Sequence, residues 1–219
     1  MFTWTSKHLS AAALAALTLL GGCDAGFFVS APTSMSVAKG SVVVTGPPGL
    51  CIDESASHNA DTGAFVLLGS CASITGSLDA GKPQIRALLT AAVSAGSNGP
   101  TVRGSMNQLS AFFRSANGRK ALSRSGNAAT VRVLGTSHTD GVMILHVRDT
   151  SPFPGQAVTP GYWRALFDLN GHIVTLSVVG VAQAPYPEAA GLQVLETFVA
   201  TVRAASPAPK ATPGAATGG

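Results

Sequence analysis

Four short groups of residues in this chain carry side chains that could bind phosphate, hold a metal ion or act as a nucleophile. The first, Gly76 to Lys82, has the glycine and lysine spacing of a P-loop, whose backbone amides and lysine contact phosphates. Pro83 stands where a P-loop has the serine or threonine that binds Mg²⁺, and no clean strand precedes Gly76. We therefore expect no nucleotide and no other cofactor.

The second group crowds carboxylates and an imidazole into one polar segment: Asp53, Glu54, His58 and Asp61. Hard and borderline metal ions accept such ligands. The spacing matches neither an EF-hand loop nor an H-E-x-x-H helix. We therefore expect a solvated loop from Asp53 to Gly63 and no metal site.

The last two groups pair a serine with a possible base. Ser137 and His138 lie close to Asp140, but adjacent side chains on an extended segment point to opposite faces, so the three do not form a triad. Ser36 and Lys39 have the S-x-x-K spacing of penicillin-binding enzymes without their companion motifs. The chain also has no G-x-S-x-G elbow, and we predict no catalytic residue.

The histidines of the chain leave an enzyme as the alternative function. A periplasmic hydrolase would need a histidine that meets a carboxylate or a serine from a distant segment. The candidates are His58, His138, His146 and His172. We interpret His146 and His172, both on expected strands, as packing residues.

The order of charges along the chain is unusual. Between Asp79 and Asp140 there is no acidic residue, whereas eight basic residues occur: Lys82, Arg86, Arg103, Arg114, Arg119, Lys120, Arg124 and Arg132. Clustered charge of one sign attracts anions. The subset Arg114, Arg119, Lys120 and Arg124 is close enough in a helical region to share a surface, and we predict that it binds an anionic partner. The alternative is that these residues scatter and pair with acids from elsewhere.

Composition limits the class of partner. The chain has 219 residues, of which 46% are hydrophobic and 11% charged, so it can bury a core and is not disordered throughout. Its net charge of +4 is too mild to indicate nucleic-acid binding, and no basic and aromatic interleaving accompanies it.

The N-terminal 22 residues have the form of a signal peptide, with Lys7 ahead of an apolar stretch from Leu9 to Leu20. This stretch is too short to span a bilayer, which takes about 20 apolar residues. Leu20-Gly21-Gly22-Cys23 resembles the lipobox of bacterial lipoproteins. The resemblance implies lipidation of Cys23 and acylation of the new amino terminus, for example by palmitate. The alternative is an ordinary secretory signal in which Cys23 is incidental.

Lipidation would tether the protein to the cell membrane, facing the periplasm. Asp24 resembles the signal that keeps lipoproteins in the inner membrane. The expected partners are then the membrane itself, through the lipid, and anionic headgroups, an acidic protein or an anionic envelope polymer. Nucleic acid is not an expected partner.

Cys51 and Cys71 remain once Cys23 is assigned to the lipid. An even pair in an oxidising periplasm predicts a disulfide, which would close a loop of about 20 residues and stabilise the fold by roughly 3 kcal/mol. The alternative is two buried free thiols.

Apolar and β-branched runs bounded by turn residues predict eight strands. They are expected at 42–44, 50–52, 64–68, 87–93, 129–134, 142–147, 162–169 and 172–179. The segment from Arg86 to Ala95 could instead be a helix opened by Pro83, and we interpret it as a strand. Asn170-Gly171 favours a type I′ hairpin turn between the last two. A helix is expected after Ser105 as N-cap, with Met106, Leu109, Phe112 and Phe113 on one face and Asn117-Gly118 as its end, followed by a short helical turn that ends by Gly126. A closing amphipathic helix is expected at 189–204.

This order predicts a single α+β domain with a mainly antiparallel sheet covered by helices. Its boundaries would be a signal peptide at 1–22, a lipidated spacer at 23–40, the globular domain at 41–205 and a disordered Pro/Ala/Gly tail at 206–219. The layout of the chain resembles that of uncharacterised bacterial lipoproteins. The motifs that carry this resemblance are the Gly-Leu-Cys-Ile-Asp opening, Phe112-Phe113, and Tyr162-Trp163-Arg164 before a hairpin. The element order is loosely similar to the α/β/α sandwich of PsbP-like domains. These observations favour a non-enzymatic binding or assembly module.

Overall fold

The computed structural model describes residues 30–77, 80–96, 98–153 and 157–208. The expected signal peptide, Cys23, Asp24, two positions of the P-loop-like segment (Leu78 and Asp79) and the tail from residue 209 lie outside the described residues. Within them, the strands are β1 Ser34–Val37, β2 Val42–Thr45, β3 Leu50–Ala60, β4 Gly63–Ser70, β5 Ala87–Ser94, β6 Val131–Thr139, β7 Val142–Asp149, β8 Val158–Leu169 and β9 His172–Val181. The helices are α1 Cys71–Thr75, α2 Met106–Arg114, α3 Ala116–Leu122 and α4 Glu188–Ala205.

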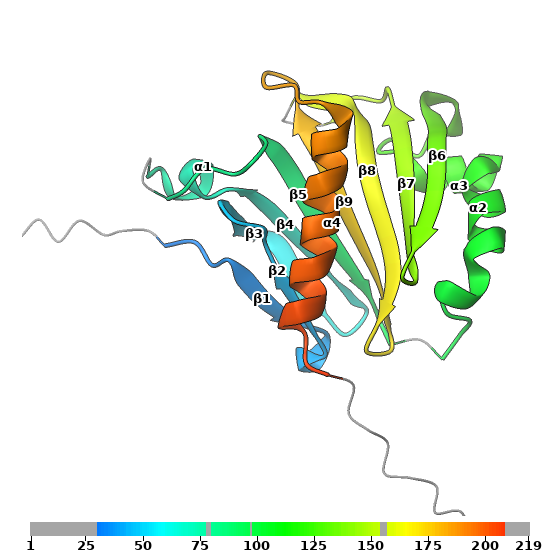
Figure 1. The fold of residues 1–219 in the computed structure, drawn as a ribbon, viewed down its shortest axis with the longest axis horizontal. Helices are drawn as coiled ribbons and strands as arrows, with labels where there is room; N and C mark the ends of the chain where they lie inside the picture. Colours follow the sequence, from blue (N-terminus) through cyan, green and yellow to red (C-terminus); the bar gives the residue numbers. More distant parts are fainter. Residues whose placement is uncertain (1–29, 78–79, 97, 154–156, 209–219) are drawn as a thin grey trace, which may run out of the picture.

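Seven of the described strands form one antiparallel sheet in the order β3-β4-β5-β9-β8-β7-β6, and β1 and β2 form a separate hairpin (Figure 1). The last four strands are a meander that returns β9 to the side of β5. Asn170 and Gly171 have φ values of 51° and 81°, which a type I′ turn requires, so the expected hairpin is confirmed. The mainly antiparallel sheet is likewise confirmed.

One face of the sheet is covered by α4 and the β1–β2 hairpin (Figure 1). Alternating positions of the central strands point to this face, as the two-residue period of a strand requires. Val174, Leu176 and Val178 of β9 pack there with Leu195 and Phe198 of α4, and all five are fully buried. This is the main core, and the amphipathic pattern of the closing helix explains why α4 lies across it.

The opposite face is covered by α2 and α3, at the β6–β7–β8 end of the sheet. Phe113 and Leu122 of these helices pack on Met143 and Leu145 of β7. The Tyr162 hydroxyl donates to the Leu122 carbonyl at 2.8 Å and fixes the end of α3 to β8. The helix pair therefore stands beside edge strand β6.

Several expected boundaries are wrong. Residues 34–40, expected as spacer, form β1 and the turn before β2. The expected loop from Asp53 to Gly63 is mostly strand, because β3 continues to Ala60 through a register shift between Asp53 and His58. Ser206, expected in the tail, is bound to the fold, because its hydroxyl accepts from the Val43 N–H.

The helical region is confirmed in part. Helix α2 begins after Ser105, as expected, but Ser105 makes no side-chain cap bond and α2 ends at Arg114. Ser115 caps the next helix, α3, where its hydroxyl accepts from the Gly118 N–H at 3.2 Å. Gly118 therefore lies inside α3 and does not end the helix. Its lack of a side chain is required because a Cβ atom there would collide with the backbone of Phe112. None of the described helices is long and apolar enough to cross a membrane.

Candidate functional site

An open cleft of about 700 Å³ lies along strand β6 and contains three arginines. Arg114 comes from the end of α2, Arg119 from α3 and Arg132 from β6 itself. The remaining lining residues are small or apolar: Ala128, Ala129, Val131, Val133 and Leu134. No carboxylate of the described chain lines this cleft. We call it the basic cleft.

The arginines of the basic cleft are held mainly by carbonyl and hydroxyl oxygens. Arg114 Nη2 donates to Thr136 Oγ1 at 3.1 Å. Arg119 Nη1 donates to the Arg114 carbonyl at 2.6 Å, and its Nε donates to the Ala128 carbonyl at 3.4 Å. The described residues contain only two ion pairs, Lys39–Asp61 and His146–Glu188, so the arginine charges have no acidic partner in this part of the chain.

Strand β6 is one of the two outer strands of the seven-stranded sheet, and α2 and α3 contact it. It pairs with β7 on one side, through a register shift between Val133 and Gly135. Leu134, at that shift, is 51% exposed. A sheet edge presents N–H and C=O groups that can pair with another strand. The basic cleft thus combines positive charge, an apolar side chain and backbone hydrogen-bonding groups.

Arg124, predicted to share the surface, is turned inward. Its guanidinium donates to the carbonyls of Ser151 and Thr159 and lies 5.7 Å from the centre of the Tyr162 ring. Burial lowers the pKa of Arg124 below its ordinary value, against the opposing effect of Asp149. The structure therefore brings Arg114 and Arg119 together, leaves Lys120 exposed on α3 outside the cleft lining, and separates Arg124 from them.

Arg132, and not Arg124, lies in the basic cleft with Arg114 and Arg119. It was among the eight basic residues of the acid-free stretch, so the charge order contained the signal. Proximity along the chain could not indicate Arg132, because Arg132 approaches Arg114 and Arg119 only through the packing of α2 and α3 against β6.

The predicted disulfide is present. Cys51 Sγ and Cys71 Sγ are bonded, joining β3 to the first residue of α1. Both cysteines are buried at 4% exposure. The bridge ties an edge strand to the core and has no free thiol for chemistry.

The acidic segment does not form a metal site in the described chain, where no group of three or more ligands gathers. Asp53 accepts from the Ser55 hydroxyl and from two backbone N–H groups, and the Ser55 bond is the main cause of its lowered pKa. Asp61 pairs with Lys39 at 3.2 Å, and His58 stacks on Phe65.

Among the histidines, only His146 meets a carboxylate of the described residues within ion-pair distance. Its Nε2 lies 3.7 Å from Oε1 of Glu188, the first residue of α4, and its ring stacks on Trp163 with 4.1 Å between ring centres. His172 Nδ1 contacts the Ser94 carbonyl at 2.9 Å, and His138 is exposed. Sequence reasoning missed the His146–Glu188 pair because no local pattern links β7 to α4.

Comparisons with protein-family models, with curated proteins and with solved structures return no match to this chain. Function must therefore be argued from the residues of the site.

Proposed function

We propose that this chain is a membrane-anchored lipoprotein facing the periplasm, whose single α+β domain binds an acidic protein segment in the basic cleft. The protein acts as a binding or assembly module and catalyses no reaction. The observation that carries the proposal is the cleft itself, where Arg114, Arg119 and Arg132 stand beside an outer strand of the sheet with no carboxylate among the described residues that line it.

The sheet edge favours a protein partner over a structureless polymer. An extended peptide can add to an exposed edge strand through main-chain hydrogen bonds, while pockets beside the strand select its side chains. Acidic side chains on such a peptide would meet the three arginines, and guanidinium groups bind carboxylates with two parallel hydrogen bonds. Leu134 offers an apolar contact between them.

The position of the cleft favours a partner away from the anchoring membrane. The described chain begins at Ser30, and the Ile52 N–H donates to the Pro32 carbonyl at 2.7 Å, so the chain enters at the β3 side. Strand β6 is at the opposite edge (Figure 1). Six strand spacings of roughly 4.8 Å separate these edges by about 29 Å. That is several times the Debye length of roughly 8 Å at physiological salt, so headgroups near the anchor are the weaker candidate.

The test compares full-length protein, purified in an uncharged detergent, with two charge-reversed variants of equal net charge. One carries Arg114→Glu and Arg132→Glu, and the control carries Lys82→Glu and Arg86→Glu outside the cleft. Poly-L-glutamate should bind the parent and the control alike and the cleft variant at least tenfold more weakly, with the β6 amides protected from hydrogen exchange. Equal weakening of both variants, or tighter binding to phosphatidylglycerol vesicles than to the peptide, would overturn the proposal.

A hydrolase is the second candidate, because His146 and Glu188 line one cavity. The cavity offers no serine or cysteine among its described lining residues. The Thr159 hydroxyl donates to the Gly161 carbonyl at 3.0 Å and is not directed to His146. Histidine and carboxylate without an activated nucleophile favour binding over covalent catalysis.

A further inference from the structure

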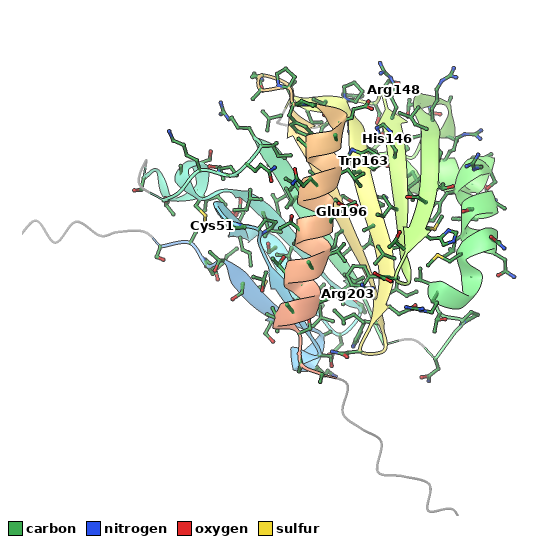
Figure 2. The ribbon with its side chains drawn as sticks, in the orientation of Figure 1. Cys51, His146, Arg148, Trp163, Glu196 and Arg203 are labelled. Atoms are coloured by element: carbon green, nitrogen blue, oxygen red, sulfur yellow. A yellow bond between two sulfur atoms is a disulfide. The ribbon has the colours of Figure 1, made fainter. Side chains whose placement is uncertain are left out.

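A second cavity, of about 190 Å³, lies on the α4 face of the sheet where α4 begins. His146 and Arg148 of β7 and Trp163 of β8 line it, and Figure 2 shows these three side chains grouped beside the start of the helix. Tyr186 and Glu188 close it from the helix side. Its volume equals that of roughly six water molecules at about 30 Å³ each, which suits a small molecule. We call it the β7 notch.

Two glycines lie opposite the β7 residues of the notch, and Gly161 is itself part of the lining. Gly161 is the cross-strand partner of Arg148, and Gly135 is the partner of His146. A Cβ atom at either glycine would meet nothing within 4 Å, and neither glycine has a positive φ. Backbone conformation and close packing therefore do not require glycine at these two positions. Glycine inside a strand weakens it and often marks a place where a ligand approaches.

Both glycines also adjoin irregular pairing. The β6–β7 register shifts between Val133 and Gly135, and the β8–β9 register shifts between Val158 and Tyr162. Such bulges are over-represented beside functional sites, where they change the direction of side chains. Strand β7, which supplies His146 and Arg148, is thus flanked by two bulged strands.

Opposite charges face the notch without pairing with each other. Arg148 and Glu188 both line it but lie farther apart than the 4.0 Å of an ion pair. Glu188 is 75% exposed and lies 3.7 Å from His146 Nε2, so one of its carboxylate oxygens faces that ring. Arg148 also has Arg132 directly across the strand pair. Like charges opposite each other destabilise a sheet, and no acid of the described residues pairs with either arginine. An oxyanion bound at Arg148 would relieve this repulsion.

The walls of the notch are mostly apolar and closely packed. Trp163 stacks on His146 and donates from Nε1 to the Glu188 carbonyl at 3.0 Å, which fixes the start of α4. Tyr186 packs so closely on two glycines that a Cβ at Gly180 or Gly191 would lie within 3 Å of its ring. Leu134 and Pro185 complete the apolar lining. The site is therefore formed before a ligand arrives.

We propose that the β7 notch binds a small zwitterion of the α-amino acid class. The ligand carboxylate would pair with Arg148, its ammonium group would face Glu188, and an apolar side chain would lie between Leu134 and Trp163. The separated positive and negative charges, the small volume and the apolar walls together select this chemistry over a plain anion. The inference does not rest on peptide binding in the basic cleft, although Leu134 lines both sites.

Trp163 reports directly on the notch. The chain has two tryptophans, Trp4 and Trp163. Trp4 lies in the expected signal peptide, so processed protein contains Trp163 alone, and Trp4→Phe removes the Trp4 signal from any unprocessed precursor. L-leucine should change its fluorescence saturably, and calorimetry should give the same dissociation constant. The analogues 4-methylpentanoate, which lacks the ammonium group, and 3-methylbutylamine, which lacks the carboxylate, should bind at least tenfold more weakly. Equal binding of either analogue, or no saturable signal by both methods, would overturn the proposal.

Three variants locate the ligand. Gly161→Val adds a Cβ atom that meets nothing within 4 Å, and its methyl groups would occupy the notch. The variant should abolish leucine binding while the melting temperature stays equal or rises, because valine favours strands. In Arg148→Gln, leucine should bind no more tightly than 3-methylbutylamine. In Glu188→Gln, leucine should bind no more tightly than 4-methylpentanoate. Unchanged leucine binding by folded Gly161→Val would place the ligand elsewhere and refute the assignment. Poly-L-glutamate binding by Gly161→Val should persist, which separates this test from that of the basic cleft.

Discussion

The backbone N–H of Arg124 donates to Oδ2 of Asp149 at 2.8 Å. This bond joins the segment after α3 to the end of β7 and directs the Arg124 side chain toward the carbonyls of Ser151 and Thr159. Because Arg124 thereby stabilises the fold, its charge is not available to a partner on the surface of α3.

We predict that Asp149→Ala destabilises the protein by about 3 kcal/mol. Asp149 is fully buried and accepts from the N–H groups of Arg124 and Ser151 and from the Ser151 hydroxyl. Removal of the carboxylate leaves these donors without their acceptor. Denaturant unfolding measures the effect, with Glu196→Ala on the exposed side of α4 as a control that should change stability by less than roughly 0.5 kcal/mol. Equal losses in the two variants would contradict the prediction.

Asp149 should also make the free energy of unfolding depend on pH in the acidic range. Burial raises its pKa, but hydrogen bonds from Arg124, Ser151 and Thr130 outweigh burial and hold the pKa below the ordinary 3.8. Since the folded pKa is the lower one, this stabilisation is complete well above pH 3.8 and is lost as pH falls through the folded pKa. Unfolding free energies measured from pH 6 downward should fall less steeply in Asp149→Asn than in the parent. Parallel curves of unfolding free energy against pH for the two proteins would show that Asp149 does not contribute to the pH dependence of stability.

Gly118→Ala should destabilise the α2–α3 pair by about 2 kcal/mol or more. The added methyl group collides with the Phe112 and Phe113 backbone, which cannot move without disturbing Phe113 in the core. Gly161→Ala adds the same methyl group into open space and serves as the matched control. Thermal unfolding should separate the two variants clearly, and a Gly118→Ala protein as stable as the control would refute the packing argument.

Reduction of the Cys51–Cys71 bridge should lower the free energy of unfolding by roughly 3 kcal/mol, because a loop of about 20 residues is released in the unfolded chain. The double variant Cys51→Ser, Cys71→Ser should show the same loss without reductant. Alkylation of denatured, unreduced protein should modify neither cysteine. Two modified thiols at these positions in the mass spectrum would contradict the bridge.

Cys23→Ser tests the anchor expected from the lipobox. The variant should incorporate no radioactive fatty acid and should keep the gel mobility of the unprocessed precursor. It should also lose the stable, lipid-mediated attachment to the membrane. Wild-type protein labelled in parallel is the control. Fatty-acid labelling that persists in the variant would show that Cys23 is not the lipid site.

Local patterns in the sequence were enough to determine most elements of this fold. The alternating runs of β7, β8 and β9, the Asn170-Gly171 turn and the closing helix all lie where short-range preferences put them, because each depends on neighbours a few residues away. The disulfide was also predictable, since only two cysteines remained once Cys23 was assigned to the lipid.

Tertiary structure alone decided which residues meet. Arg132 lies with Arg114 and Arg119 because β6 is the edge strand beside α2 and α3. Arg124 lies apart from them because its backbone N–H donates to the buried Asp149 of β7. His146 meets Glu188 because α4 begins over β7 and β8. The order of the strands sets these contacts, and that order follows from the burial of two separate cores on the two faces of one sheet.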